Sequence, residues 1–274
     1  MLIDKKNKFL NLGCGNRYHK DWINLDFHSS NQDVDEYNLL NGIPYSDNTF
    51  DVVYHSHLLE HFSKSDALRF INECYRVLKP NGIIRIAVPD LEIIVKNYLK
   101  YLELASLGNR IAESNYDWIM LEMYDQCVRN HGGGEMKKYL KQKNIPNKEF
   151  IRERIGYFFD IMTNQNDIES KNWKIKVKNL IPIDQSRLFI KELKNKINWY
   201  KNIQLGKFRQ SGEIHQWMYD SFSLTRLLKF CGFIKITKRD AASSSIKNWA
   251  QYNLDTEPNG TVYKPDSLFI EANK

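Results

Sequence analysis

The segment from Ser56 to His61 contains three side chains that can exchange protons or bind a metal: His57, Glu60 and His61. Imidazoles change charge near neutral pH, so His57 and His61 are candidate general bases. For Glu60 we predict a structural role, either capping the following helix or accepting hydrogen bonds from backbone amides. If the HxxEH spacing lies on a helix, it also places all three side chains on one face, where they suit a divalent ion.

A second set of residues has the spacing of a nucleotide-binding turn. The run FLNL predicts a short buried strand that ends at Leu12, and Gly13 and Gly15 let the backbone turn sharply and approach a ligand. The next apolar run stops at Asp26, whose carboxylate can accept hydrogen bonds from two ribose hydroxyls. An ordinary turn between strands is the alternative, because Gly-x-Gly is common by chance.

Two later segments add histidines to the candidate set. In DQCVRNHGGGEM (125–136), His131 precedes three glycines, which suit either a lid over a bound molecule or an ordinary flexible loop. GEIHQWMYD (212–220) combines His215 with aromatic residues that either pack against the core or form the floor of a binding site. His131 and His215 are therefore candidate catalytic residues beside His57 and His61.

These residues need a scaffold to bring them together, and the hydrophobic pattern predicts an α/β sheet. Apolar runs alternate with turns and helical patterns over the first third of the chain. Strands are predicted at Phe50–Ser56 and within IIRIAVP, and a helix from Ser63 to Leu78, capped by Ser63, lies between them. A helix from Ser221 to Gly232 and strands at 233–237 and 267–272 complete the pattern.

The periodicity divides the chain into three predicted parts. Residues 1–98 form the N-terminal part of the core, and residues 213–274 form its C-terminal part. Residues 99–212 show mainly helical periodicity, which predicts an insertion that covers the bound molecule as a lid.

Composition and length are those of a globular protein. With 274 residues and a hydrophobic fraction of 42%, the chain can bury a substantial core. It has no run of about eighteen apolar residues and no signal-peptide pattern, which predicts a cytoplasmic protein. Four scattered cysteines without a CxxC pair predict reduced thiols rather than a zinc site or a disulfide framework.

The net charge of +7 is unevenly distributed. Between Lys171 and Arg209 the chain carries eleven basic residues and two acidic ones. A solvated helical face is the ordinary interpretation of such a run. The alternative is a surface that attracts a phosphate-bearing molecule, an anionic membrane or nucleic acid.

Four stretches in this order resemble the class I S-adenosylmethionine-dependent methyltransferases, of the small-molecule type that act in surface-glycan biosynthesis: LNLGCG, NLLNGIPYSDNTFDVVYHSHLLEHF, YRVLKPNGIIRIAVPD and LLKFCGF. The resemblance covers residues 8–98 and 221–272. It implies a Rossmann-like, seven-stranded, mostly parallel sheet with an antiparallel last strand, and S-adenosylmethionine as the cofactor. The cofactor would lie across the carboxyl ends of the first strands, as is general for open α/β sheets.

The resemblance also implies roles for individual residues. The glycine turn would pass close to the methionine part, Asp26 would hold the ribose, Asn38 and its neighbours would flank the adenine, and Ser56 and His57 would border the sulfonium. The implied cofactor-binding residues are Leu12, Gly13, Cys14, Gly15, Asp26, Asn38, Leu39, Leu40, Ser56 and His57.

Two features depart from the family pattern. Arg17 stands where the family usually has a third glycine, and the stretch before Asp26 is too short for a full helix and a strand, so we expect an abbreviated first crossover. Asn38 stands where many relatives carry Asp against the adenine amino group. Its amide oxygen can still accept a hydrogen bond, but without the charge.

The resemblance implies transfer of a methyl group to a hydroxyl or phosphate-type oxygen of a small acceptor such as a sugar, sugar nucleotide or glycan precursor. We assign no residue to a metal, because the HxxEH motif directly follows a strand within the methyltransferase-like order of stretches. A metal-assisted transferase, with His131 or His215 completing the site, is an alternative. Two further alternatives are an RNA methyltransferase that uses segment 171–209 and a non-catalytic cofactor-binding scaffold.

Overall fold

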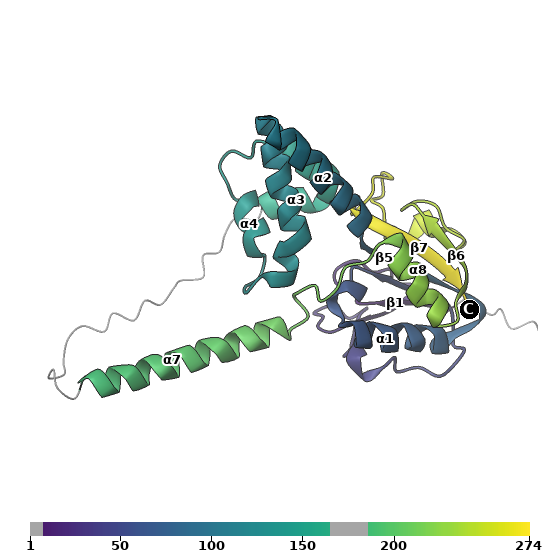
Figure 1. Cartoon of the computed structure of the whole chain (residues 1–274). Coiled ribbons are helices and arrows are strands. Elements are labelled where there is room, and N and C mark those ends of the chain that lie inside the picture. Colours follow the sequence, from purple (N-terminus) through teal and green to yellow (C-terminus); the bar gives the residue numbers. More distant parts are fainter. Residues whose placement is uncertain (1–7, 165–185) are drawn as a thin grey trace, which may run out of the picture.

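The computed structural model describes residues 8–164 and 186–274, and its centre is a seven-stranded sheet (Figure 1). The strand order is β3-β2-β1-β4-β5-β7-β6, and β7 runs antiparallel to both of its neighbours, whereas β1 to β5 pair in parallel. This arrangement confirms the predicted Rossmann-like sheet. The strands are β1 (Phe9–Leu12), β2 (Ile23–Asp26), β3 (Asp35–Glu36), β4 (Phe50–Ser56), β5 (Leu78–Pro89), β6 (Ile234–Arg239) and β7 (Ser267–Asn273).

The central strands are buried on both faces, and successive side chains alternate between them. Val53 of β4 and Ile86 of β5 belong to a large core on one face. Tyr54 of β4 packs in a separate, aromatic cluster, and Arg85 of β5 lies over the ring of Trp249 in that cluster. The alternation explains why a nearly continuous apolar run such as IIRIAVP forms a central strand.

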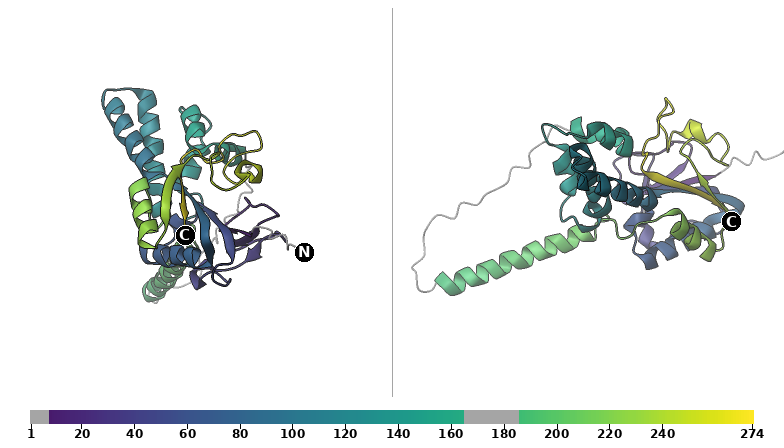
Figure 2. Two further views of the ribbon diagram at one scale, coloured as in Figure 1. Left: turned by 90° about the vertical axis from the view of Figure 1, so that its right-hand side faces the viewer. Right: turned by 45° about the horizontal axis from the view of Figure 1, so that its top comes forward.

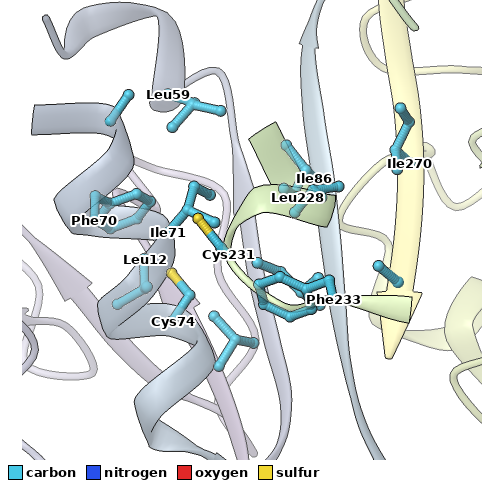
Figure 3. Close-up of a cluster of buried hydrophobic side chains, with 14 of the residues drawn as sticks. Leu12, Leu59, Phe70, Ile71, Cys74, Ile86, Leu228, Cys231, Phe233 and Ile270 are labelled. Carbon is cyan, nitrogen blue, oxygen red and sulfur yellow. The ribbon is translucent and has the colours of Figure 1, made fainter. Parts of the chain in front are cut away.

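Helices α1 (Lys64–Val77) and α8 (Ser221–Phe230) cover the face that bears Val53. Each begins where a side chain satisfies a free backbone amide: Ser63 accepts from Asp66, and Asp220 forms a capping box with Ser223. The predicted bounds of both helices hold to within about two residues. Figure 3 shows the core that they close, including Leu12, Phe70, Ile71, Ile86, Leu228 and Phe233.

On the other face, the segment 240–256 packs against the sheet and includes the short helix η3 (Trp249–Tyr252). The fully buried guanidinium of Arg85 bonds to the carboxylates of Asp255 and Glu271, at 2.8 Å in each case. A buried charge is tolerated only when it is paired in this way. This network of ion pairs therefore holds the segment 240–256 against the middle of the sheet.

Residues 91–164 form a helical part with a core of its own, built around the fully buried Trp118. Its helices are α2 (Leu91–Ser106), α3 (Arg110–Val128), α4 (Gly134–Leu140), α5 (Lys148–Ile155) and α6 (Tyr157–Asn164). Figures 1 and 2 show this part above one end of the sheet, with α7 (Ser186–Arg209) extending away from both. The predicted boundary at residue 98 falls within α2, and the three-part division of the chain stays a prediction.

The connection from β1 to β2 contains no helix, which confirms the abbreviated first crossover. Trp22, immediately before β2, is buried among the aromatic residues of the segment 240–256. It covers part of the sheet face that a helix between β1 and β2 would otherwise cover. In the part of the chain that the structure describes, no helix combines the length and the apolar character needed to cross a membrane.

Candidate functional site

The glycine turn lies at the carboxyl end of β1, as predicted. Gly13 and Gly15 have φ angles of +61° and +52°, a region that other residues adopt only with strain. A Cβ atom on Gly13 would lie 2.6 Å from the side chain of Leu58, so this position also lacks space. The amide of Gly15 donates to the Asp26 carboxylate at 2.6 Å, which holds the turn against the end of β2.

A cavity of about 440 Å³, which we call the outer cavity, opens beside this turn. Asp26 and Asn38 line it, together with the exposed apolar side chains of Phe27 and Leu40. The amide oxygen of Asn38 accepts a hydrogen bond from the backbone of Leu40 at 3.0 Å and thereby caps the short helix η1 (Leu39–Asn41). The oxygen predicted to face an adenine amino group therefore already accepts one hydrogen bond within the protein.

A second space of about 250 Å³, the inner cavity, lies on the other side of Gly13. Cys14, Gly15 and Ser56 line it, and burial raises the pKa of the Cys14 thiol to about 12, so the thiol is uncharged. Leu12 instead lies fully within the hydrophobic core and lines none of these cavities.

Arg17, which departs from the family pattern, has a clear structural role. Its guanidinium bonds to Glu257 at 3.0 Å and to the carbonyl of Thr256 at 2.5 Å, and lies 4.1 Å from the ring centre of Tyr263. We call these contacts of Arg17 with the 254–266 loop the Arg17 clamp. Leu254, Tyr263 and Lys264 of that loop form one wall of the inner cavity.

A third space of about 340 Å³, the helix-side cavity, lies between the sheet and the helical part. Glu122 and Gln126 of α3 line it, together with Arg129, which follows the last residue of that helix, and they face His61 and His215. Burial raises the pKa of Glu122, and Arg154 opposes this effect through hydrogen bonds as short as 2.6 Å. One wall of the cavity is therefore helical, and several polar groups line the cavity.

His57 lines all three cavities. Its backbone has a φ of +50°, an uncommon conformation for a residue with a side chain, and its amide donates to the carbonyl of Ala87 at 2.9 Å. Its Nδ1 lies 3.3 Å from Glu60, and its Nε2 lies 2.8 Å from the hydroxyl of Ser267. Both ring nitrogens thus have fixed neighbours at the point where the cavities meet.

Glu60 does not cap the following helix and accepts no hydrogen bond from a backbone amide, so our prediction for it was wrong. Ser63 caps α1 instead, and the fully buried Glu60 carboxylate faces histidines. The HxxEH motif is only partly helical, because η2 (Leu59–His61) is a single turn that excludes His57. Burial alone would raise the pKa of Glu60, but His57, His215 and His61 together lower it below its ordinary value.

His61 and His215 come together in space, with ring centres 4.7 Å apart. The Nδ1 of His61 donates to the carbonyl of Ile214 at 3.1 Å, which leaves Nε2 as its unprotonated nitrogen when the ring is neutral. Burial lowers the pKa of both rings, that of His215 to about 3. Near neutral pH both imidazoles are therefore uncharged.

Of the predicted catalytic histidines, the structure unites His57, His61 and His215 but not His131. The His131 side chain is exposed, and the cavity wall near it comes from Arg129 and Gly133. The carboxylate of Asp125 binds the first amides of α4, which fixes this turn with His131 on the outside.

The sequence interpretation missed Lys264 and Ser267, which lie beside His57. Lys264 lines both the inner and the helix-side cavities, and burial lowers its pKa. One signal was available: a last strand antiparallel to β5 must start where β5 ends, so the residues at its start belong at the carboxyl edge of the sheet.

Part of the chain that builds this site is similar to a known protein family. Residues 10–86 match the family described as a methyltransferase domain. Over these residues the chain is similar to methyltransferase domains. Such a domain implies S-adenosylmethionine as its cofactor. The matched residues include the glycine turn, Asp26 and the segment from Ser56 to His61.

A curated relative, "Probable methyltransferase ltbC" of Aspergillus luteorubrus, is 45% identical over 51 residues. The match spans only 18% of this chain and 18% of that relative.

Solved structures include a SAM-dependent methyltransferase of Archaeoglobus fulgidus, 13% identical, covering 98% of this chain and 87% of that one with a TM-score of 0.37. Another, from Thermotoga maritima, is 12% identical and covers 99% and 84%, with a TM-score of 0.39. Both TM-scores are below 0.5, so these two similarities add nothing to the family match.

Proposed function

We propose that this protein transfers a methyl group from S-adenosylmethionine to a hydroxyl oxygen of a small polar acceptor. The observation that carries the proposal is the position of His57, which borders the outer cavity, the inner cavity and the helix-side cavity at once. A donor held along the first two and an acceptor held in the third would meet at this residue.

The residues around the glycine turn fit the cofactor. Space is free beside Gly15, so a ligand can approach its backbone closely. One Asp26 oxygen holds the amide of Gly15, and the carboxylate also lines the outer cavity, where it can accept hydrogen bonds from ribose hydroxyls. Phe27 and Leu40 offer exposed apolar surface to a planar base.

The helix-side cavity suits a small acceptor rather than a polymer. Its volume of about 340 Å³ lies at the lower end of the range for small-molecule sites, about 300–1,000 Å³. Gln126, Arg129 and Lys264 provide hydrogen bond donors to oxygen-rich groups. We therefore propose a sugar, sugar nucleotide or other glycan precursor as the acceptor, and with it a role in cytoplasmic polysaccharide biosynthesis.

The chain must position the acceptor and take one proton from it. When bound, S-adenosylmethionine supplies a methyl group on a positively charged sulfur. His57 is the best-placed base, because Glu60 faces its Nδ1 and the Nε2 contacts Ser267, a hydroxyl that an acceptor hydroxyl can replace or use as a relay. Closure by the helical part would exclude water from the reaction.

Calorimetry with S-adenosylhomocysteine, the demethylated product, tests the donor site. We expect wild-type protein to bind it, and Asp26→Ala to bind about 10- to 100-fold more weakly, because hydrogen bonds to a charged group contribute about 1.5–3 kcal/mol. Asp21→Ala is the control, since Asp21 is an exposed acid of the same loop that lines none of the three cavities. No binding by the wild type, or equal binding by Asp26→Ala, would contradict the proposal.

A further inference from the structure

We propose that Glu60, His61 and His215 form a binding site for a divalent transition-metal ion beside the helix-side cavity. One donor atom from each residue lies within 4.8 Å of the other two. Metal bonds of about 2.1 Å bring neighbouring ligands to about 3–4 Å from one another, so small rotations of the side chains complete the site. Two imidazole nitrogens and one carboxylate are a donor set that suits zinc and neighbouring first-row metals.

The state of Glu60 is the strongest observation. Its side chain is fully buried, and neither carboxylate oxygen has a hydrogen bond partner. A buried, ionised carboxylate without such partners is costly. His57, with its Nδ1 at 3.3 Å, faces only one of the two oxygens. A bound cation would satisfy the other oxygen and compensate the charge.

The two histidines are held in the form that binds metals. Since Nδ1 of His61 donates to the carbonyl of Ile214, its Nε2 is the nitrogen that is free to coordinate. The amide of His215 donates to the carbonyl of Gln126 at 2.9 Å, which fixes its backbone against α3. Metal-binding histidines commonly have their second ring nitrogen anchored, as that of His61 is by Ile214.

The segments that carry the three ligands are also tied together. The backbone carbonyl of Glu60 accepts hydrogen bonds from the amides of Gln216 and Trp217, at 2.7 and 3.2 Å. The side chain of Gln216 in turn donates to the carbonyl of His61 at 2.9 Å. The ligands therefore come from two segments whose relative position is set before any ion binds.

The position of the ligands indicates what the ion does, and this step rests on the proposed function. His61 and His215 line the helix-side cavity, whereas Glu60 lies behind them. The bound ion would have open coordination positions towards the acceptor. It would hold one acceptor oxygen there and lower the pKa of the acceptor hydroxyl, while His57 takes the proton. Arg129 and Lys264 line the same cavity, as do Glu213 and Asp266, and Glu60 is the carboxylate grouped with the two histidines.

Titration of the metal-free full-length chain with Co²⁺ tests the site, because Co²⁺ bound to nitrogen and oxygen ligands absorbs visible light and Zn²⁺ should displace it. We expect one equivalent to bind, and His215→Gln and Glu60→Gln to bind at least roughly 100-fold more weakly. His19→Gln is the control, because His19 lies outside all three cavities. Circular dichroism checks that each variant is folded. If Glu60→Gln is not folded, His215→Gln alone decides the test.

No uptake of Co²⁺ or Zn²⁺ by the wild type, or undiminished uptake by folded His215→Gln, overturns the metal site while the donor proposal stands. Conversely, metal uptake without binding of S-adenosylhomocysteine leaves the site intact and rejects the proposed function. Once an acceptor is known, we expect chelation to abolish turnover and the metal to restore it. Unchanged turnover in a metal-free preparation would reject the assigned role of the ion.

Discussion

His55 shows how strongly the interior of this fold controls a single ionisable residue. It lies at 0% exposure next to the ring of Phe70, and neither ring nitrogen has a hydrogen bond partner. Burial lowers its pKa from 6.5 to about 4, although the charge of Glu60 acts in the opposite direction. His55 is thus neutral in the folded protein under conditions in which the unfolded chain would bind a proton.

This difference makes His55 a source of acid sensitivity. Its contribution to stability is fully present above pH 6.5 and is lost as the pH falls from 6.5 towards 4, because only the unfolded state gains the proton in that range. At about 1.4 kcal/mol per pH unit, His55→Leu should lose about 2 kcal/mol less of its free energy of unfolding between pH 7 and pH 5 than the wild type. Urea unfolding at both pH values measures this, and parallel losses in the two proteins would contradict it.

At this scale, the local part of the site could be predicted from sequence and the distant part could not. Gly13 directly follows β1 and Asp26 is the last residue of β2, so the pattern that marks the strands also placed these two residues. Ser267 meets His57 across 210 residues of sequence, and no periodicity connects the two. His131 had the right residue type and glycine neighbours, but the cap at α4 turned it outwards.

The Arg17 clamp acts at the scale of elements, because it joins the first loop of the sheet to the C-terminal 254–266 loop. We expect Arg17→Gln to free this wall of the inner cavity and weaken S-adenosylhomocysteine binding about tenfold, which corresponds to about 1.4 kcal/mol. Calorimetry measures the change, with Lys20→Gln as an exposed control in the same loop. If Arg17→Gln binds as tightly as Lys20→Gln, the clamp does not support the donor site.

Helices α3 and α5 are joined by a buried ion pair, Glu122 with Arg154. Removing one partner leaves an uncompensated charge, so Arg154→Met should lower the free energy of unfolding by about 3–5 kcal/mol. The double variant Glu122→Gln with Arg154→Met should cost less, since no charge remains and the amide oxygen can still accept from Trp118. Urea denaturation measures all of these changes.

The matched control is Arg152→Met, on the same helix as Arg154, which removes an exposed ion pair with Asp160 of α6. Its cost should stay within about 1 kcal/mol. Equal costs for Arg152→Met and Arg154→Met would show that burial does not determine the strength of this pair.

At the scale of the whole molecule, the sheet and the helical part each have a core, and α7 extends away from both (Figure 2). The sheet order was predictable because its strands are marked by apolar runs in a family-specific order. The packing of the helical part was not, because helical periodicity shows which face is buried but not which helix covers it. Part of the basic segment, residues 171–185, lies outside the described residues.

The basic charge of α7 belongs either to a solvated face or to a binding surface, and substitution of its lysines distinguishes the two. Lys196, Lys201 and Lys207 are exposed on it. If the charge is only solvated, replacing all three with Gln leaves S-adenosylhomocysteine affinity unchanged, and the wild type retains no generic RNA in filter binding at low salt. Salt-dependent RNA retention that the triple variant loses would instead favour the RNA methyltransferase alternative.

The position of β7 has a consequence for how the molecule folds. It lies between β5 and β6, and among the described strands β6 pairs with β7 alone, so the sheet has a gap until β7 arrives. Arg85 and Glu271, which bond across that pairing, are 186 residues apart in sequence. Closing so long a loop is a slow, entropically costly event. Because Ser267 starts β7, its contact with His57 forms only at that event, so the candidate site is complete only after β7 has paired.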